Sequence, residues 1–125
     1  MTTTLTAATT KDVAARFEQL AEQEQWFQIQ DELFADDVKS IDPDGSPYFG
    51  YAEGKASVKK KGEDFVGKVT AGHARSTTRP IVAANHFVVG RYVDITTQDH
   101  GRIVIDELML YEVRGGKIVS EQFFY

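Results

Sequence analysis

The side chain of this 125-residue sequence that is best placed for chemistry is the carboxylate of Asp42, because Pro43 follows it directly. A proline ring disfavours the helical conformation in the residue before it, so Asp42 is expected in extended backbone. Its carboxylate, which accepts protons and hydrogen bonds, then points in a fixed direction. Residues 42–45, Asp-Pro-Asp-Gly, also have the composition of a simple turn, and on these four residues alone that interpretation stays open.

The composition of the chain limits the kinds of partner that it can bind. A net charge of −5 argues against nucleic acid, whose phosphates need a basic surface. The lysines at positions 59–61 fall in a predicted helix and are interpreted as a solvent-exposed face. No apolar run approaches the roughly 20 residues that a membrane span needs. The absence of cysteine excludes disulfide bonds and thiolate metal sites, and it agrees with the cytoplasmic location that we predict.

The spacing of apolar residues predicts helices in the first half of the chain and long strands in the second. Helices are predicted over residues 11–24, 26–34 and 55–69. Strands are predicted over residues 38–41, 75–84, 86–97, 102–114 and 117–125, the last three joined by hairpin turns that contain glycine. Residues 1–10, rich in Thr and Ala, are interpreted as a flexible tail, and residues 11–125 as a single domain.

Alternation along the predicted strands divides their residues between two faces of a curved sheet. The face expected to be concave carries Ile103, Ile105, Glu107, Met109, Tyr111, Val113, Arg91, Val93, Ile95, Val119, Glu121, Phe123 and Tyr125. The opposite face is also largely apolar, with Val104, Leu108 and Leu110. Because the helices can cover only one face, we expect the other to meet a second copy of the chain in a homodimer.

The order of the elements and one motif resemble a known family. Residues 34–46 read Phe-Ala-Asp-Asp-x-x-x-x-Asp-Pro-x-Gly-Ser, and the last hairpin continues as Gly-Lys-Ile-Val-Ser at 116–120. The chain resembles the nuclear-transport-factor-two-like superfamily, in its SnoaL-like and ketosteroid-isomerase-like branch. The resemblance implies an α+β fold, with three N-terminal helices packed on a strongly curved antiparallel sheet that forms a conical pocket. It does not select one activity, because the scaffold hosts isomerases, dehydratases, cyclases and noncatalytic binding proteins.

The resemblance also implies a role for Asp42. In ketosteroid isomerases the Asp at this position is the general base that moves a proton next to a carbonyl group, facing donors that hold the developing enolate oxygen. The positions that match those two donors are Phe17 and Met109 here, and neither side chain donates such a hydrogen bond. Steroid isomerisation is therefore not expected. Glu107, one inward position before Met109, is a candidate replacement donor in its protonated form.

Two groups of side chains make up the predicted site. The catalytic candidates are Asp42 and Glu107. The candidates for ligand binding are Phe17, Trp26, Tyr48, Tyr51, Arg91, Met109, Tyr111, Glu121, Phe123 and Tyr125. Arg91 has an alternative role as the ion-pair partner of Glu107 or Glu121, and the aromatic residues have one as ordinary core residues. The three histidines, His73, His86 and His100, lack the clustered spacing of metal ligands, so neither a metal nor a cofactor is predicted.

Two functions from different classes fit these observations. The first is a cofactor-free isomerase, lyase or cyclase that binds a small hydrophobic or aromatic carbonyl compound and uses Asp42 as general base. The second is a noncatalytic ligand-binding or dimerisation domain on the same fold, in which Asp42 serves the turn. The direction of the Asp42 carboxylate separates them, because a base must face an apolar cavity and a turn residue faces bulk solvent.

Overall fold

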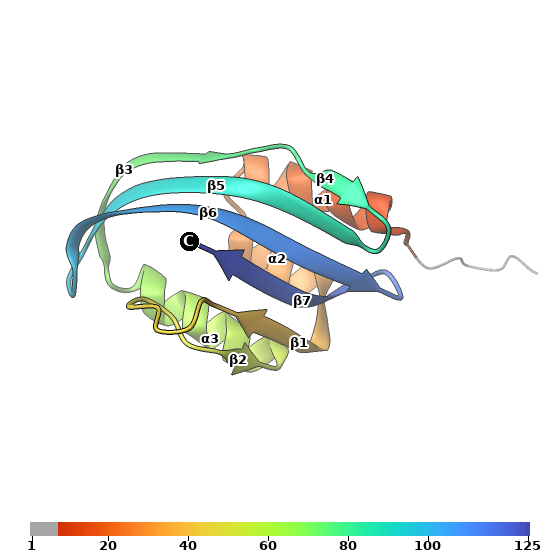
Figure 1. Ribbon diagram of the computed structural model, residues 1–125, viewed down its shortest axis with the longest axis horizontal. Coiled ribbons are helices and arrows are strands. Elements are labelled where there is room, and N and C mark those ends of the chain that lie inside the picture. The colour runs from red at the N-terminus through yellow and green to blue at the C-terminus, as the bar shows by residue number, and fades with distance from the viewer. Residues whose placement is uncertain (1–7) are drawn as a thin grey trace, which may run out of the picture.

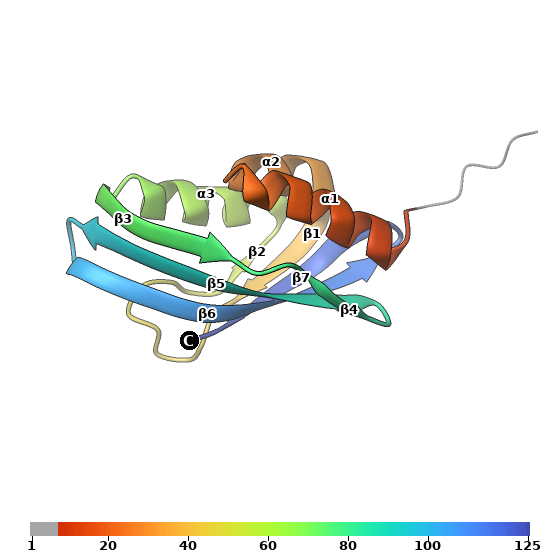
Figure 2. The same cartoon turned by 90° about the horizontal axis from the view of Figure 1, so that it is seen from above.

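Three helices pack against one face of a curved sheet in the computed structural model of this chain, which describes residues 8–125 (Figures 1 and 2). The helices are α1 (Thr10–Glu22), α2 (Trp26–Leu33) and α3 (Lys55–Val66). The strands are β1 (Phe34–Ile41), β2 (Ala52–Glu53), β3 (Val69–Thr77), β4 (Ile81–Ala83), β5 (His86–Thr97), β6 (Gly101–Arg114) and β7 (Lys117–Phe124). The α+β fold predicted from the sequence is confirmed.

The sheet has the strand order β2-β1-β7-β6-β5-β3, with β4 also paired to β5. Neighbouring strands run antiparallel except for β1 and β7, which run parallel. The sheet is therefore mixed, whereas the sequence predicts an antiparallel one. A parallel pair needs a long connection, and here the connection contains α3 and all the other strands. The pairing sets Ser40 of β1 opposite Glu121 of β7.

Helix α1 begins with a capping box. The Thr9 hydroxyl accepts a hydrogen bond from the Asp12 amide, and the Asp12 carboxylate accepts one from the Thr9 amide. The buried stripe of the helix consists of Val13, Ala14, Phe17, Leu20 and Ala21. Of the predicted tail over residues 1–10, the first seven lie outside the described residues, and Thr10 already belongs to α1.

The corner between α1 and α2 contains an unusual backbone conformation. Glu24 has a φ of 55°, in the left-handed region that residues other than glycine rarely adopt. The chain reverses there, and the Gln25 amide returns to the Leu20 carbonyl at 2.9 Å. The corner lies at the junction of the first two predicted helices, and it turns the side chain of Glu24 toward the sheet, where it meets Arg91.

The largest differences from the predicted elements occur at three places in the chain. Phe34 begins β1 rather than ending α2. Helix α3 ends at Val66 before Gly67, and the chain from Val69 onward pairs with β5 instead of continuing the helix. The single strand predicted over residues 75–84 is divided into β3 and β4, because Pro80 has no amide hydrogen to give to the ladder.

A β-bulge in β7 corrects the predicted inward face of that strand. Glu112 of β6 pairs with Ser120, but Val113 pairs with Ile118, so Val119 is an extra residue on the β7 side. Ile118 is consequently the residue buried in the core, and not Val119 as alternation predicts. Beyond the bulge, Glu121 faces inward as expected.

The two faces of the sheet have different surroundings. The face beneath the helices contributes Phe87, Val89, Met109, Tyr111, Val113 and Ile118 to the hydrophobic core. Alternation places Val104, Leu108 and Phe124 on the other face, and each of these side chains is exposed. Within residues 8–125, no helix has the length and apolar character that crossing a membrane requires.

Candidate functional site

A cavity of about 910 Å³ lies between the helices and the inward face of the sheet. Its apolar walls include Phe27, Phe49, Phe65, Val93, Ile95, Ile105, Met109 and Phe123. Charged side chains reach it at a few places, and these are Glu24, Asp42, Lys61, Arg75, Arg91, Glu107 and Glu121. Apolar walls with a few convergent polar groups are typical of small-molecule sites, which makes this cavity the candidate functional site.

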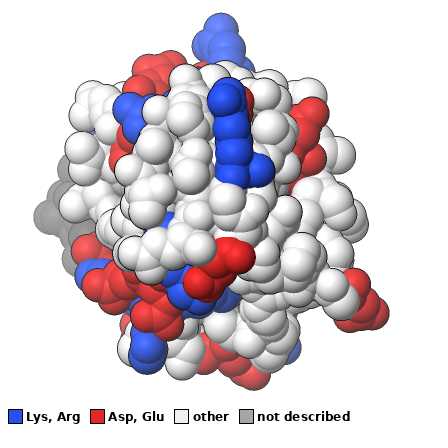
Figure 3. Space-filling view, turned by 90° about the vertical axis from the view of Figure 1, so that its left-hand side faces the viewer, with Lys and Arg blue, Asp and Glu red and all other residues white. Residues whose placement is uncertain are grey.

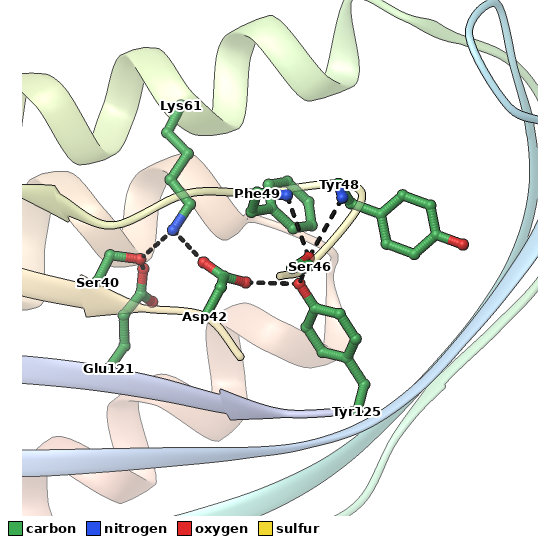
Figure 4. A network of polar contacts seen from close by, with 8 residues as sticks. All are labelled: Ser40, Asp42, Ser46, Tyr48, Phe49, Lys61, Glu121 and Tyr125. Carbon is green, nitrogen blue, oxygen red and sulfur yellow. Dashed lines mark hydrogen bonds and ion pairs between the residues drawn. The ribbon is translucent and has the colours of Figure 1, made fainter. Parts of the chain in front are cut away.

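Asp42 follows β1 directly and faces the cavity with only 2% of its side chain exposed. Tyr125 Oη donates a hydrogen bond to its Oδ1 atom at 2.9 Å, and the ammonium of Lys61 donates to Oδ2 (Figure 4). Ser46 Oγ lies 2.6 Å from Tyr125 Oη. Since the tyrosine gives its one proton to Asp42, Ser46 must be the donor to Tyr125. The Asp42 carboxylate is thus fixed inside the cavity rather than turned to bulk solvent.

The cation beside Asp42 belongs to a lysine that we predicted on the solvent-exposed face. That prediction is wrong for Lys61, because only 15% of its side chain is exposed. The α3 residues that line the cavity at helical spacing are Val58, Lys61, Gly62, Phe65 and Val66. The two lysines before Lys61 do face the surface, where Lys59 forms an ion pair with Asp31 and Lys60 forms one with Asp64.

Glu121 is connected to the same lysine through Ser40. The Ser40 hydroxyl donates to Glu121 Oε1 at 2.7 Å and accepts from Lys61 Nζ at 2.9 Å. Burial raises the pKa of Glu121 to about 7, while the Ser40 hydrogen bond and the Lys61 charge oppose this and the Asp42 charge adds to it. Glu121 therefore changes its charge near neutral pH.

Glu107 lines the cavity from β6. Burial raises its pKa to about 7, with the Arg91 charge opposing and the charges of Asp42 and Glu121 adding to the shift. Arg91 is its partner in the strand register, but the guanidinium turns to Glu24 instead. Within the described part of the chain no other side chain is hydrogen-bonded to Glu107, which leaves its carboxyl group available to a ligand.

Glu24 holds Arg91 in the cavity wall, and not Glu107 or Glu121 as the sequence-based alternative has it. Arg91 Nη2 and Nη1 donate to the two carboxylate oxygens of Glu24 at 2.9 and 3.3 Å, and Nη1 also donates to Thr77 at 2.9 Å. The guanidinium lies 4.4 Å from the ring centroid of Trp26. Burial pushes the pKa of Glu24 upward, but hydrogen bonds from Arg91 and Trp26 and nearby positive charge outweigh it, so the pKa is lowered.

The other predicted binding residues meet the cavity in different ways. Those that line it are Trp26, Met109, Tyr111 and Phe123. Phe17 is fully buried behind the wall, where its ring packs against those of Trp26 and Tyr111. Burial raises the pKa of Tyr111 well above its usual value, so its hydroxyl stays protonated.

Tyr48 and Tyr51 line a second, smaller cavity of about 400 Å³ instead. It lies next to the β5–β6 turn, at an end of the molecule where uncharged residues form most of the surface (Figure 3). Phe49, Lys61 and Phe65 line both cavities, and the two phenylalanine rings have centroids 4.6 Å apart. These rings therefore stand between the two cavities.

Sequence reasoning missed four polar side chains of the site, which are Glu24, Ser40, Ser46 and Lys61. The helical spacing from Val58 to Phe65 was a usable signal for Lys61. The other three depend on backbone geometry that has no local signature. His73 lines the cavity and Thr96 Oγ1 lies 2.7 Å from its Nε2 atom, but no group of three His, Asp or Glu able to hold a metal occurs within residues 8–125.

The fold and the chain as a whole are similar to known structures. A protein of Mesorhizobium loti described as a SnoaL-like polyketide cyclase is 28% identical with a TM-score of 0.87, and the match covers 94% of this chain and 100% of that one. TerC, co-crystallised with polyporic acid, is 15% identical with a TM-score of 0.69, over 93% and 90% of the two chains.

A third structure has a ketosteroid-isomerase-like fold and comes from Catenulispora acidiphila in complex with trimethylamine. It is 18% identical with a TM-score of 0.63, over 79% of this chain and 73% of that one. A search of curated proteins finds no significant match. The model of the SnoaL-like domain family matches residues 8–125, and the chain therefore belongs to this family, within the nuclear-transport-factor-two-like superfamily.

Proposed function

We propose that this SnoaL-like protein binds a small hydrophobic carbonyl compound and carries out a cofactor-free isomerase, lyase or cyclase reaction with Asp42 as general base. The observation that carries the proposal is the carboxylate of Asp42, 2% exposed and held by two donors at the wall of an apolar cavity of about 910 Å³. A carboxylate fixed in this way needs little reorganisation to take a proton from a bound ligand. The similarity to the Mesorhizobium loti protein described as a polyketide cyclase supports the same class of reaction.

Glu107 is the proposed hydrogen-bond donor to the carbonyl oxygen. Its pKa of about 7 keeps a substantial protonated fraction at neutral pH, and a protonated carboxyl group donates a hydrogen bond. When Asp42 takes the proton from the carbon beside the carbonyl, the C–H electron pair moves toward the carbonyl oxygen, and Glu107 stabilises the charge that develops there. Returning the proton to another carbon completes an isomerisation.

The experiment begins with a thermal-shift screen of aromatic ketones and related carbonyl compounds. A compound that binds the folded protein and not the unfolded chain raises the melting temperature. Each compound that binds is then incubated with the wild type and with Asp42→Asn, and products are measured by chromatography. We expect product formation by the wild type to fall by at least 100-fold in the variant, the order of a lost general base. Asp44→Asn, in the same loop but exposed, is the matched control. Equal product from both Asp42 forms removes Asp42 from the mechanism.

The alternative function is noncatalytic ligand binding in the same cavity. The contact that favours it is the ion pair between Lys61 and Asp42, which already uses one oxygen of the carboxylate. Under this alternative the screen still finds ligands, but the wild type converts none of them, and Asp42→Asn changes affinity without any change in the chemical identity of the ligand.

We further propose that the exposed sheet face joins two copies of the chain in a homodimer. Leu108 of β6 and Phe124 of β7 are paired neighbours, exposed by 54% and 47%, and Val104 lies on the same face beyond Asp106. Neighbouring exposed apolar side chains such as Leu108 and Phe124 are typical of protein interfaces. Two-fold symmetry would cover the same residues on both copies.

A further inference from the structure

Among residues 8–125, Lys61 finds acceptors for two of its N–H groups, which leaves one hydrogen-bond donor for a ligand. A protonated lysine has three N–H groups, and the Lys61 ammonium gives two of them, to Ser40 Oγ and to Asp42 Oδ2. Beyond these acceptors it lies 5.6 and 5.7 Å from the ring centroids of Phe49 and Phe123, both of which line the cavity. Ring faces attract a cation only weakly, so a ligand oxygen between these rings would be a stronger partner.

Lys61 is also the cation of the cavity that lies directly against Asp42. Three carboxyl groups, those of Asp42, Glu107 and Glu121, influence one another electrostatically there. Arg91 and Arg75 also line this cavity, but both pair with Glu24 instead. Negative charge that forms on a ligand near Asp42 therefore meets Lys61 first.

We propose that Lys61 binds the ligand oxygen as it becomes negative, so that this side chain is the cationic group that holds the oxyanion in the cavity. This assignment rests on the proposed function in taking Asp42 as the base. It adds a cationic donor beside Asp42 to the neutral donor that we propose for Glu107.

The ion pair moves with the proton in this mechanism. At the start Asp42 carries the negative charge beside Lys61. When Asp42 accepts the proton, the C–H electron pair forms a carbon–carbon double bond and the carbonyl π pair moves to the oxygen, so Asp42 becomes neutral and the oxygen becomes negative. The ammonium then exchanges one anionic partner for the other without leaving its place, and its attraction to the ligand is greatest after the proton has moved. Return of the proton from Asp42 to carbon restores the original pair.

The test uses 4-nitrophenol and 2-naphthol, stable aromatic alcohols whose ionised forms absorb at longer wavelength than the neutral forms. Absorbance titrations at a pH below the pKa of the free phenol give both the affinity and the ionised fraction of the bound probe. We expect the wild type to bind the anion preferentially. Lys61→Met should lower the affinity for the anion at least tenfold, while Lys60→Met, one residue away but paired with Asp64 at the surface, should match the wild type.

A second set of variants separates attraction by Lys61 from repulsion by Asp42. Asp42→Asn removes the carboxylate that competes for Lys61, so the anion should bind more tightly than in the wild type, although turnover falls. In the double variant with Lys61→Met, most of that gain should disappear. Lys61→Arg keeps a cation and should retain the preference for the anion, which guards against a general effect of substitution at Lys61.

Two results would overturn the assignment to Lys61. One is a bound probe that is equally ionised in the wild type and in Lys61→Met. The other is a gain in Asp42→Asn that persists in full in the double variant. Retained turnover in Asp42→Asn would instead reject the proposed base, and the probe titrations would still decide the role of Lys61.

Discussion

The ammonium of Lys61 donates a hydrogen bond to the carboxylate of Asp42, joining the middle of α3 to the residue that follows β1. The contact lies inside the cavity, where the exposed fractions of the two side chains are 15% and 2%. A pair so shielded from water interacts more strongly than a surface pair, but each ion also loses more hydration. The pair therefore links the stability of the fold directly to the arrangement of the site.

We predict energetic coupling between Lys61 and Asp42. Lys61→Met leaves the Asp42 carboxylate buried without its cation, and the free energy of unfolding should fall by about 3 kcal/mol. Adding Asp42→Asn removes that buried charge, so the double variant should recover part of the loss. Urea denaturation of the four proteins should give a coupling energy of about 1–3 kcal/mol.

The control for this cycle is the exposed pair of Lys60 and Asp64 on the same helix. Exposed pairs at this spacing contribute only about 0.3–0.5 kcal/mol, so the coupling between Lys60→Met and Asp64→Asn should be small. If both cycles gave the same small value, Lys61 and Asp42 would interact no more strongly than a surface pair.

Stability should fall as the pH rises toward neutrality because of Glu107 and Glu121. Both have a pKa of about 7 in the folded protein against an ordinary value of 4.5. Below pH 4.5 the folded and the unfolded protein both hold these protons, and the two groups make their full contribution to the free energy of unfolding. Between 4.5 and 7 the unfolded chain loses them while the folded protein keeps them, so unfolding becomes easier, by up to about 1.4 kcal/mol per pH unit for each group.

Glu107→Gln should therefore flatten the decline in stability between pH 4.5 and 7. Chemical denaturation at a series of pH values measures the slope. Glu22→Gln, on the exposed side of α1, serves as the matched control and should keep the slope of the wild type. An unchanged slope in Glu107→Gln would show that burial does not perturb this carboxyl group.

Arg91→Lys should destabilise the protein although it preserves the charge. A lysine cannot donate from two nitrogens to Glu24 or present a flat face to Trp26, as the guanidinium does. We expect a loss of about 1–2 kcal/mol in urea denaturation, the scale of one or two charge-assisted hydrogen bonds. The equivalent change at Arg102, which pairs with Asp94 at the surface, should have little effect. Equal effects at both positions would contradict a special role for Arg91.

The proposed homodimer should dissociate into single chains when a charge is placed on the outer face of the sheet. Sedimentation velocity of the wild type at micromolar concentration should give the mass of two chains. Leu108→Glu should give one chain, because a carboxylate beside Phe124 in the interface would be buried without a partner. Gln28→Glu adds the same charge on the helical side and should remain dimeric. A monomeric wild type would reject this interface.

Much of the fold was predictable because its signals are local. Apolar spacing located α1, α2 and most of α3, and glycine-containing turns located the hairpins of β5, β6 and β7. Alternation placed Arg91, Glu107 and Met109 on the face that lines the cavity. The direction of Asp42 also followed from local chemistry, since Pro43 restricts the backbone next to it.

The contacts that complete the site were not predictable in this way. Ser40 reaches Glu121 only because β1 and β7 pair in parallel, and that pairing joins distant parts of the chain. Glu24 reaches Arg91 through a left-handed backbone that its residue type does not favour. The prediction that Lys61 is exposed is wrong because it places three consecutive lysines on one face of a helix. Consecutive residues of a helix point to different sides, and Lys61 points to the cavity.

The bulge at Val119 has a consequence for how the sequence of this protein can change. Ile118 before it belongs to the core, and Glu121 after it belongs to the cavity, although the two are separated by an odd number of positions. The bulge resets the alternation of β7, so the residues before it and the residues after it follow separate inward–outward patterns. The segment after the bulge lines the cavity, and the segment before it fills the core. Substitutions that change the cavity lining can therefore accumulate in one segment of β7 while the core residues of the other stay the same.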